Sequence, residues 1–150
     1  MYIHYMDIVS DPADMLCKGN IGALYVGSQR ATTAEYLQSH NISVVISLVQ
    51  THIDIPDITH HYYNVHDDSS DLSRMQQVIA EVLPLIHRYR MSHHNVLVHC
   101  RMGVQRAPTV CAHYLHKYYG YSLETCYKKV IYRRPCAFYG GRYYTFGKLK

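Results

Sequence analysis

One short segment of the chain combines a cysteine and an arginine at a spacing that suits phosphate chemistry. Residues 99–108 read His-Cys-Arg-Met-Gly-Val-Gln-Arg-Ala-Pro, so that five residues separate Cys100 from Arg106. A cysteine thiolate can attack phosphorus directly. A planar guanidinium can hold two phosphate oxygens through parallel hydrogen bonds and stabilise the charge of the transition state. We therefore predict a phosphate-binding loop that carries a cysteine nucleophile.

The residues on either side of this segment predict how it is held. Val96-Leu97-Val98 reads as a buried strand, and a helix should begin near Ala107 or Pro108, because proline suits a first helical turn. A cysteine delivered to a helix N-terminus lies among free backbone N–H groups at the positive end of the helix dipole, which stabilises its thiolate. Gly103 supplies the freedom for a tight turn. The loop residues expected to surround the phosphate are Arg101, Met102, Gly103, Val104, Gln105 and Arg106.

Attack by sulfur also requires a proton for the departing alcohol or phenol, so a carboxylic acid is expected on a second loop. Asp67 and Asp68 are the candidates, since they follow a predicted strand that ends at Val65. The alternative reading is structural, because aspartates before a helix commonly form Asx turns or helix caps.

The rest of the chain alternates strands with helices. Residues 21–27, 42–49, 61–65 and 96–98 are predicted strands. Helices are predicted over 32–40, from Leu72 with Ser70 or Asp71 as its cap, from 107 or 108 to Gly120, and from Ser122 to the residue before Pro135. Residues 1–18 show no clear period and are interpreted as an N-terminal arm. We predict one α/β domain over 1–150, with a central, mostly parallel sheet of four to five strands flanked by helices and the site at its carboxyl end.

Composition narrows the function. The formal charge of +4, from 15 basic and 11 acidic residues with no long basic run, fits an anionic substrate but does not indicate nucleic acid, which we do not expect as a partner. Five cysteines without a Cys-x-x-Cys pair argue against a disulfide framework and favour a reducing compartment, the cytoplasm or nucleus. The twelve histidines lack metal-ligand spacing, so we expect no metal and no cofactor. No stretch is apolar enough for a membrane span.

The motif His99-Cys100-x5-Arg106 resembles the signature of the cysteine-dependent protein tyrosine phosphatase superfamily, in its small dual-specificity branch. The preceding strand, residues 24–28 and residues 42–48 are similar to that branch in order and spacing, so the resemblance covers about residues 19–135. It implies a protein tyrosine phosphatase-like fold. It also implies that Cys100 forms a phosphocysteine intermediate, that Arg106 binds phosphate, and that His99 orders the loop. Asp67 would be the general acid and then the base, with Asp68 as the second choice.

Two positions depart from the family pattern. The family usually has serine or threonine after the arginine, and its hydroxyl helps the sulfur leave; this chain has Ala107. Arg133-Arg134-Pro135 resembles the branch, but residues 136–141 lack the asparagine often found there. Together with Arg101, the pair Arg133 and Arg134 could attract a second anionic group, although solvated surface charge is an equal alternative.

The resemblance implies a dual-specificity protein phosphatase that acts on phosphotyrosine and phosphoserine or phosphothreonine, with phosphorylated proteins as partners. The small size of the domain is similar to that of atypical cellular and virus-encoded members, and a viral enzyme would act in the host cell. One alternative is an RNA 5′-phosphatase or a phosphoinositide phosphatase, although the loop lacks the Arg-Thr-Gly ending common in those relatives. Another is a weakly catalytic phosphate-binding module, which only Ala107 supports. A homodimer through the arm that contains Asp11 is a further possibility.

Overall fold

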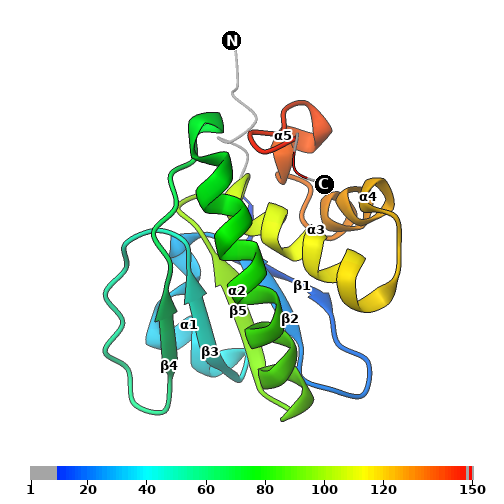
Figure 1. The fold of residues 1–150 in the computed structure, drawn as a ribbon. Coiled ribbons are helices and arrows are strands. Elements are labelled where there is room, and N and C mark those ends of the chain that lie inside the picture. The colour runs from blue at the N-terminus through cyan, green and yellow to red at the C-terminus, as the bar shows by residue number, and fades with distance from the viewer. Residues whose placement is uncertain (1–9, 148, 150) are drawn as a thin grey trace.

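The strand that precedes Cys100 lies at the centre of a five-stranded sheet (Figure 1). The computed structural model describes residues 10–147 and 149. Its strands are β1 (Ala13–Cys17), β2 (Leu24–Gly27), β3 (Ile42–Ser47), β4 (Thr59–Tyr62) and β5 (Asn95–His99), in the spatial order β1-β2-β5-β3-β4. All neighbours pair in parallel except β1, which is antiparallel to β2. The predicted single α/β domain with a mostly parallel sheet is confirmed.

Helices cover both faces of the sheet. The helices are α1 (Ala34–Ser39), α2 (Leu72–Met91), α3 (Arg106–Tyr119), α4 (Leu123–Arg133) and α5 (Phe138–Gly141). Helices α2, α3 and α4 pack on one face, and α1 packs on the other (Figure 1). Strand β5 is therefore covered on both sides, and residues 96–98 are fully buried. This explains why β5 is an unbroken apolar run rather than an alternating one.

Short polar signals set the helix ends. The Thr33 side chain accepts from Tyr36 N at the start of α1, and that of Ser122 accepts from Thr125 N at the start of α4. Gly120 ends α3 with a φ of 75°, the left-handed conformation that glycine adopts at little cost. These three boundaries agree with the sequence prediction.

Three local expectations were wrong. Residues 13–17 form β1, although the sequence suggested only an arm without regular structure; residues 1–9 of that arm lie outside the described residues. The strand expected over 61–65 instead spans Thr59–Tyr62. Asp71 occupies the N-cap position of α2 but forms no cap, because its carboxylate accepts a hydrogen bond from His66 N at 2.8 Å.

Within the described part of the chain, no helix is both long and apolar enough to cross a membrane.

Candidate functional site

Cys100 lies at the junction of β5 and α3, beneath the first turn of the helix. Its side chain is buried, and Sγ accepts a hydrogen bond from Ala107 N at 3.4 Å. The backbone N–H of Cys100 donates to Gly27 O at 3.3 Å, which ties the loop to β2. The sulfur therefore lies at the N-terminus of α3, where backbone N–H groups and the helix dipole attract negative charge. We call residues 100–106 the phosphate loop.

One part of the Arg106 guanidinium already forms hydrogen bonds to backbone carbonyl groups. Its Nη1 donates to Val65 O at 3.0 Å and, more weakly, to Leu48 O at 3.5 Å. Its Nε is buried and has no hydrogen-bond partner in the described part of the chain. Because an unpaired buried donor is costly, this edge of the fork is prepared for an acceptor that enters the loop, such as a phosphate oxygen.

Gly103 is required for the shape of the loop on two grounds. Its φ of +72° lies in the left-handed region, where a side chain would be strained. A Cβ at this position would also lie 2.7 Å from both the carbonyl carbon of Gly27 and Nη2 of Arg134. Among the other loop residues, Arg101 and Met102 are exposed at the outer edge, whereas Val104 is buried.

Arg134 supports the phosphate loop from behind. It is fully buried, and it donates from Nε to Gly103 O at 2.9 Å and from Nη2 to Met102 O at 3.1 Å. Its Nη1 donates to Asp14 Oδ2 at 2.9 Å. In a trans peptide the N–H points opposite to the C=O, so these bonds turn the N–H groups of the loop away from Arg134 and toward the loop interior. The expectation that Arg134 attracts a second anionic group was therefore wrong, because its donors are already used inside the protein.

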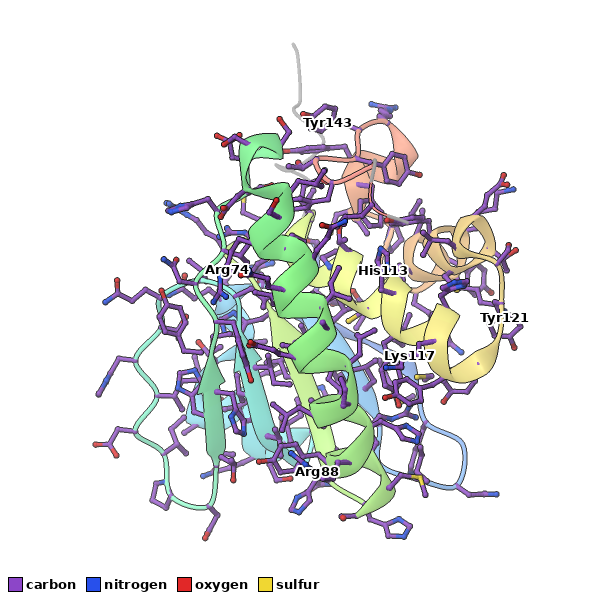
Figure 2. All side chains as sticks on the ribbon, viewed as in Figure 1. Arg74, Arg88, His113, Lys117, Tyr121 and Tyr143 are labelled. Carbon is purple, nitrogen blue, oxygen red and sulfur yellow. The ribbon has the colours of Figure 1, made fainter. Side chains whose placement is uncertain are left out.

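A second support comes from the C-terminal segment. Gln105 is buried, and its side chain donates from Nε2 to Tyr143 O and accepts from Thr145 N at Oε1, both at 2.9 Å. Val104 O accepts from Phe138 N at 2.8 Å. Figure 2 shows Tyr143 at the end of the molecule where α2 begins and the C-terminal segment folds over. Sequence reasoning placed Gln105 in the loop but gave no sign of this clamp, since its partners are backbone groups 38 and 40 residues away.

Residues 64–71 form a loop above Arg106 that is held at several points. Arg74, labelled in Figure 2, donates from Nε to Asn64 O at 2.9 Å. Arg106 Nη1 donates to Val65 O, and the carboxylate of Asp71 accepts from His66 N. Together these bonds fix both the entry to this loop and its return to α2.

The two candidate acids in this loop differ in what they contact. The carboxylate of Asp68 accepts from Ser70 N at 2.8 Å and caps a turn of 3-10 helix; these hydrogen bonds lower the pKa of Asp68. Asp67 is exposed, and its carboxylate has no partner among residues 10–147 and 149. A carboxyl group that is hydrogen-bonded as an anion is a poor proton donor, so the geometry favours Asp67 for that role.

His99 is buried beneath Cys100 in a chain of hydrogen bonds. Its Nδ1 lies 3.2 Å from Cys100 O and must donate, because a carbonyl can only accept. Its Nε2 then accepts from the Ser47 hydroxyl, and Ser47 Oγ accepts in turn from His60 Nε2 at 2.7 Å. Burial lowers the pKa of His99 to about 4, so the ring is neutral at pH 7. A neutral ring with one defined tautomer orders the Cys100 peptide without adding charge to the site.

The comparisons with known proteins agree with this geometry. The family model described as dual specificity phosphatase, catalytic domain, matches residues 24–142. The chain belongs to the dual-specificity phosphatase family. This confirms the resemblance seen in the sequence and places the whole strand–loop–helix unit around Cys100 within the matched region of this family.

Individual relatives are more distant. The chain is 28% identical to rat dual specificity protein phosphatase 5 over 112 residues, which cover 74% of this chain and 29% of that protein. It is 30% identical to the Slingshot homolog protein phosphatase of Xenopus laevis over 112 residues, which cover 74% of this chain and 16% of that protein. The chain thus spans less than a third of the length of these relatives.

Solved structures of the family share the fold. Human DUSP28 is 25% identical, and the match has a TM-score of 0.69 and covers 86% of this chain and 85% of that chain. DUSP15 is 24% identical, with a TM-score of 0.75 and coverage of 83% of this chain and 78% of that chain. Both likenesses extend over nearly all of the described domain.

Proposed function

We propose that this protein is a phosphatase that hydrolyses phosphotyrosine and phosphoserine or phosphothreonine in proteins through a phosphocysteine intermediate. The observation that carries the proposal is the pairing of two groups in one loop. Cys100 Sγ is held at a helix N-terminus, and the buried Nε of Arg106 lacks a partner within the described residues. A tetrahedral dianion would satisfy this donor and the loop amides at once.

In the first step, the loop amides and Arg106 hold the phosphoryl oxygens while the Cys100 thiolate attacks phosphorus. A sulfur–phosphorus bond forms and the ester bond to the substrate oxygen breaks. That oxygen leaves with the electron pair and takes a proton from the carboxyl group of Asp67. The products are a phosphocysteine and the free hydroxyl group of the substrate.

In the second step, water attacks the phosphorus atom of the phosphocysteine. Asp67, now a carboxylate, accepts a proton from this water, the sulfur–phosphorus bond breaks, and the thiolate is restored as inorganic phosphate leaves. In this chain the departing sulfur receives a hydrogen bond from Ala107 N, but position 107 has no side-chain hydroxyl, which the resemblance to the family leads one to expect there. We therefore propose that the second step limits turnover.

The cysteines and the relatives support proposals about the compartment and the substrates of the protein. All five cysteines are free in the structure, which supports a reducing compartment such as the cytoplasm or nucleus. The relatives named above are protein phosphatases, so phosphorylated proteins are favoured as substrates over RNA 5′ ends and phosphoinositides. A homodimer through the arm that contains Asp11 remains a prediction for a mass measurement in solution.

The test is phosphate release from one panel of substrates: phosphotyrosine, phosphoserine and phosphothreonine peptides, 5′-triphosphate RNA, and phosphoinositides. We expect turnover of the peptides, and rapid acid quenching should trap phosphate on the protein. Cys100→Ser is the matched control and should abolish both signals. Turnover that survives Cys100→Ser, or turnover of RNA or lipid alone, would refute the proposal. Binding of the peptides without turnover would identify a phosphate-binding module instead.

A further inference from the structure

A groove separate from the phosphate loop lies along α4. It encloses about 560 Å³ and is formed where α4 meets the end of α3 and strand β1. Buried Leu16 and Leu115 contribute apolar surface to it. Its remaining lining includes Tyr119, Tyr121, Lys129 and Arg133, and we call it the α4 groove. Figure 2 labels Tyr121, which lies on the connection between α3 and α4.

The charged residues that line the α4 groove are all basic. Lys128, Lys129 and Arg133 all line it and are all exposed, whereas none of its lining residues in the described chain is acidic. Lys128 does pair with Glu124 at 3.5 Å, but the two side chains are 75% and 83% exposed, so water screens this pair. The groove therefore attracts a negatively charged ligand.

One wall of the groove is already ordered. The buried Arg90 donates from Nη1 to the hydroxyl of Tyr119 at 3.0 Å, and the ring of Tyr121 stacks on that of Tyr119 with an interplanar angle of 10°. Lys129 Nζ in turn lies 4.4 Å from the centre of the Tyr121 ring. This series fixes an aromatic surface and a cation at one place. A ligand that binds there loses little free energy in ordering the wall.

The phosphate loop and the α4 groove are linked through neighbouring residues of the chain. Arg133 lines the groove, and the next residue, Arg134, donates to the carbonyl oxygens of Met102 and Gly103. Leu115 and Tyr119 of the groove follow Arg106 by 9 and 13 residues along α3, which corresponds to about 14 and 20 Å at about 1.5 Å per helical residue. An extended peptide covers about 3.3 Å per residue, so a substrate held at Cys100 would reach the groove with residues roughly four to eight positions from its phosphorylated side chain.

We infer that the α4 groove binds an acidic segment of the substrate protein, next to the phosphorylated residue. Carboxylates of that segment lie against Lys129 and Arg133, and an apolar side chain covers Leu16 and Leu115. This inference rests on the proposed function. A peptide fits better than nucleic acid, because Tyr119 and Lys129 already contact the Tyr121 ring and hinder base stacking there.

The test compares two phosphotyrosine peptides that differ only in glutamate or glutamine at positions four to eight. We expect the wild type to prefer the glutamate peptide in kcat/KM by about tenfold at low salt, as two charge contacts of about 0.7 kcal/mol each would give. Lys129→Glu combined with Arg133→Glu should reduce this preference to about one. Lys117→Glu, a lysine on α3 outside the groove, is the matched control and should keep the preference (Figure 2).

Several outcomes would overturn the inference. Equal kcat/KM for the two peptides, or an unchanged preference in the double variant, would do so while leaving the phosphatase activity standing. If no ester is hydrolysed, the proposed function fails, and fluorescence anisotropy with the unphosphorylated glutamate peptide still tests the groove. In that assay, tighter binding of an oligonucleotide than of the peptide would contradict a peptide groove. Circular dichroism checks folding, and Lys129→Gln with Arg133→Gln replaces the double variant if charge reversal unfolds it.

Discussion

Arg106 Nη1 lies 3.0 Å from the carbonyl oxygen of Val65, and this hydrogen bond joins the phosphate loop to the loop that carries Asp67. Asp67 follows Val65 by only two residues. The group proposed to bind phosphate and the group proposed to donate a proton are therefore positioned by one contact. A phosphate that draws the Nε edge of Arg106 into the loop would also pull on Val65, and so on the backbone that carries Asp67.

The first prediction concerns Asp67. Asp67→Asn removes the proposed proton donor and should lower kcat/KM, which reports the first step, by about 10²- to 10⁴-fold for phosphoserine and phosphothreonine peptides. The loss should be much smaller for p-nitrophenyl phosphate, because nitrophenolate leaves without a proton. Steady-state kinetics with both substrates provide the measurement.

Asp68→Asn is the matched control for this experiment. The amide oxygen that replaces the carboxylate oxygen can still accept from Ser70 N, so stability and kcat/KM should both change little. A larger loss of kcat/KM for Asp68→Asn than for Asp67→Asn would reverse the assignment of the acid.

Ala107→Ser should speed the second step of the reaction. Ala107 N lies 3.4 Å from Cys100 Sγ, so a serine hydroxyl at this position can donate to the departing sulfur. One added hydrogen bond of about 1 kcal/mol corresponds to roughly fivefold in rate. Rapid-quench kinetics should show a burst of product in the wild type and a smaller burst in the variant. An unchanged or slower turnover would show that hydrolysis of the phosphocysteine is not limited here.

Arg134→Met should damage both stability and activity. It removes the donors that hold Met102 O and Gly103 O and leaves Asp14 without its cation, although burial already raises the pKa of that carboxyl. Loss of one partner of a buried pair costs about 3 kcal/mol, and a displaced loop lowers kcat/KM roughly 10²-fold. Adding Asp14→Leu should restore stability in chemical denaturation but not activity. Recovery of both would mean that Arg134 does not position the loop.

Gln105→Glu tests the clamp between the phosphate loop and the C-terminal segment. A carboxylate can still accept from Thr145 N, but it repels Tyr143 O and places a negative charge behind the loop. Inorganic phosphate should therefore inhibit the variant several-fold more weakly. Gln38→Glu makes the same chemical change on the exposed surface of α1 and should leave inhibition unaltered. Equal inhibition of both variants would argue against the clamp.

The stability of the fold should fall in mild acid because of buried histidines. Burial lowers the pKa of His113 to about 4, and Nε2 of this ring has no partner in the described part of the chain. The unfolded chain takes up a proton below pH 6.5 and the folded chain does not, so stability is complete above pH 6.5 and declines as the pH falls toward 4. Burial lowers the pKa of His99 in the same way. Each of the two rings contributes on the order of 3 kcal/mol to the stability that is lost in acid.

His113→Leu separates the two contributions. It should raise the free energy of unfolding at pH 7 by about 1 kcal/mol, because it removes a buried nitrogen that has no partner among the residues the structure describes. It should also make the decline between pH 6.5 and 4 about half as steep, as measured by urea denaturation at each pH. The same slope in both proteins would assign the acid sensitivity to other groups.

The unit from Val96 to Gly120 could be predicted because its signals are local. An apolar run, a cysteine, a glycine and a proline at the start of a helix each act on their immediate neighbours, and the structure has β5, the loop and α3 in that order. Asp67 was harder to distinguish from Asp68. Sequence alone cannot show that Ser70 N donates to the carboxylate of Asp68, while that of Asp67 has no partner among the described residues.

Features that depend on distant partners escaped the sequence. Strand β1 pairs with β2 through a register shift between Met15 and Cys17, so its side chains do not alternate between buried and exposed as a strand pattern requires. Arg134 looked like a surface cation because its acceptors on Asp14 and Gly103 lie 120 and 31 residues away. Local pattern carries no information about such contacts.

The contacts of Arg134 also bear on the order of folding. They connect the start of the chain, the phosphate loop and the end of α4, and closing so long a loop is slow relative to forming helices. We expect the phosphate loop to take its final shape late, after residues 11–14 and the end of α4 have docked. A nascent chain that has emerged only as far as α3 would contain Cys100 without a shaped loop around it. In refolding, the protection of this thiol from alkylating reagents should therefore trail the appearance of helix.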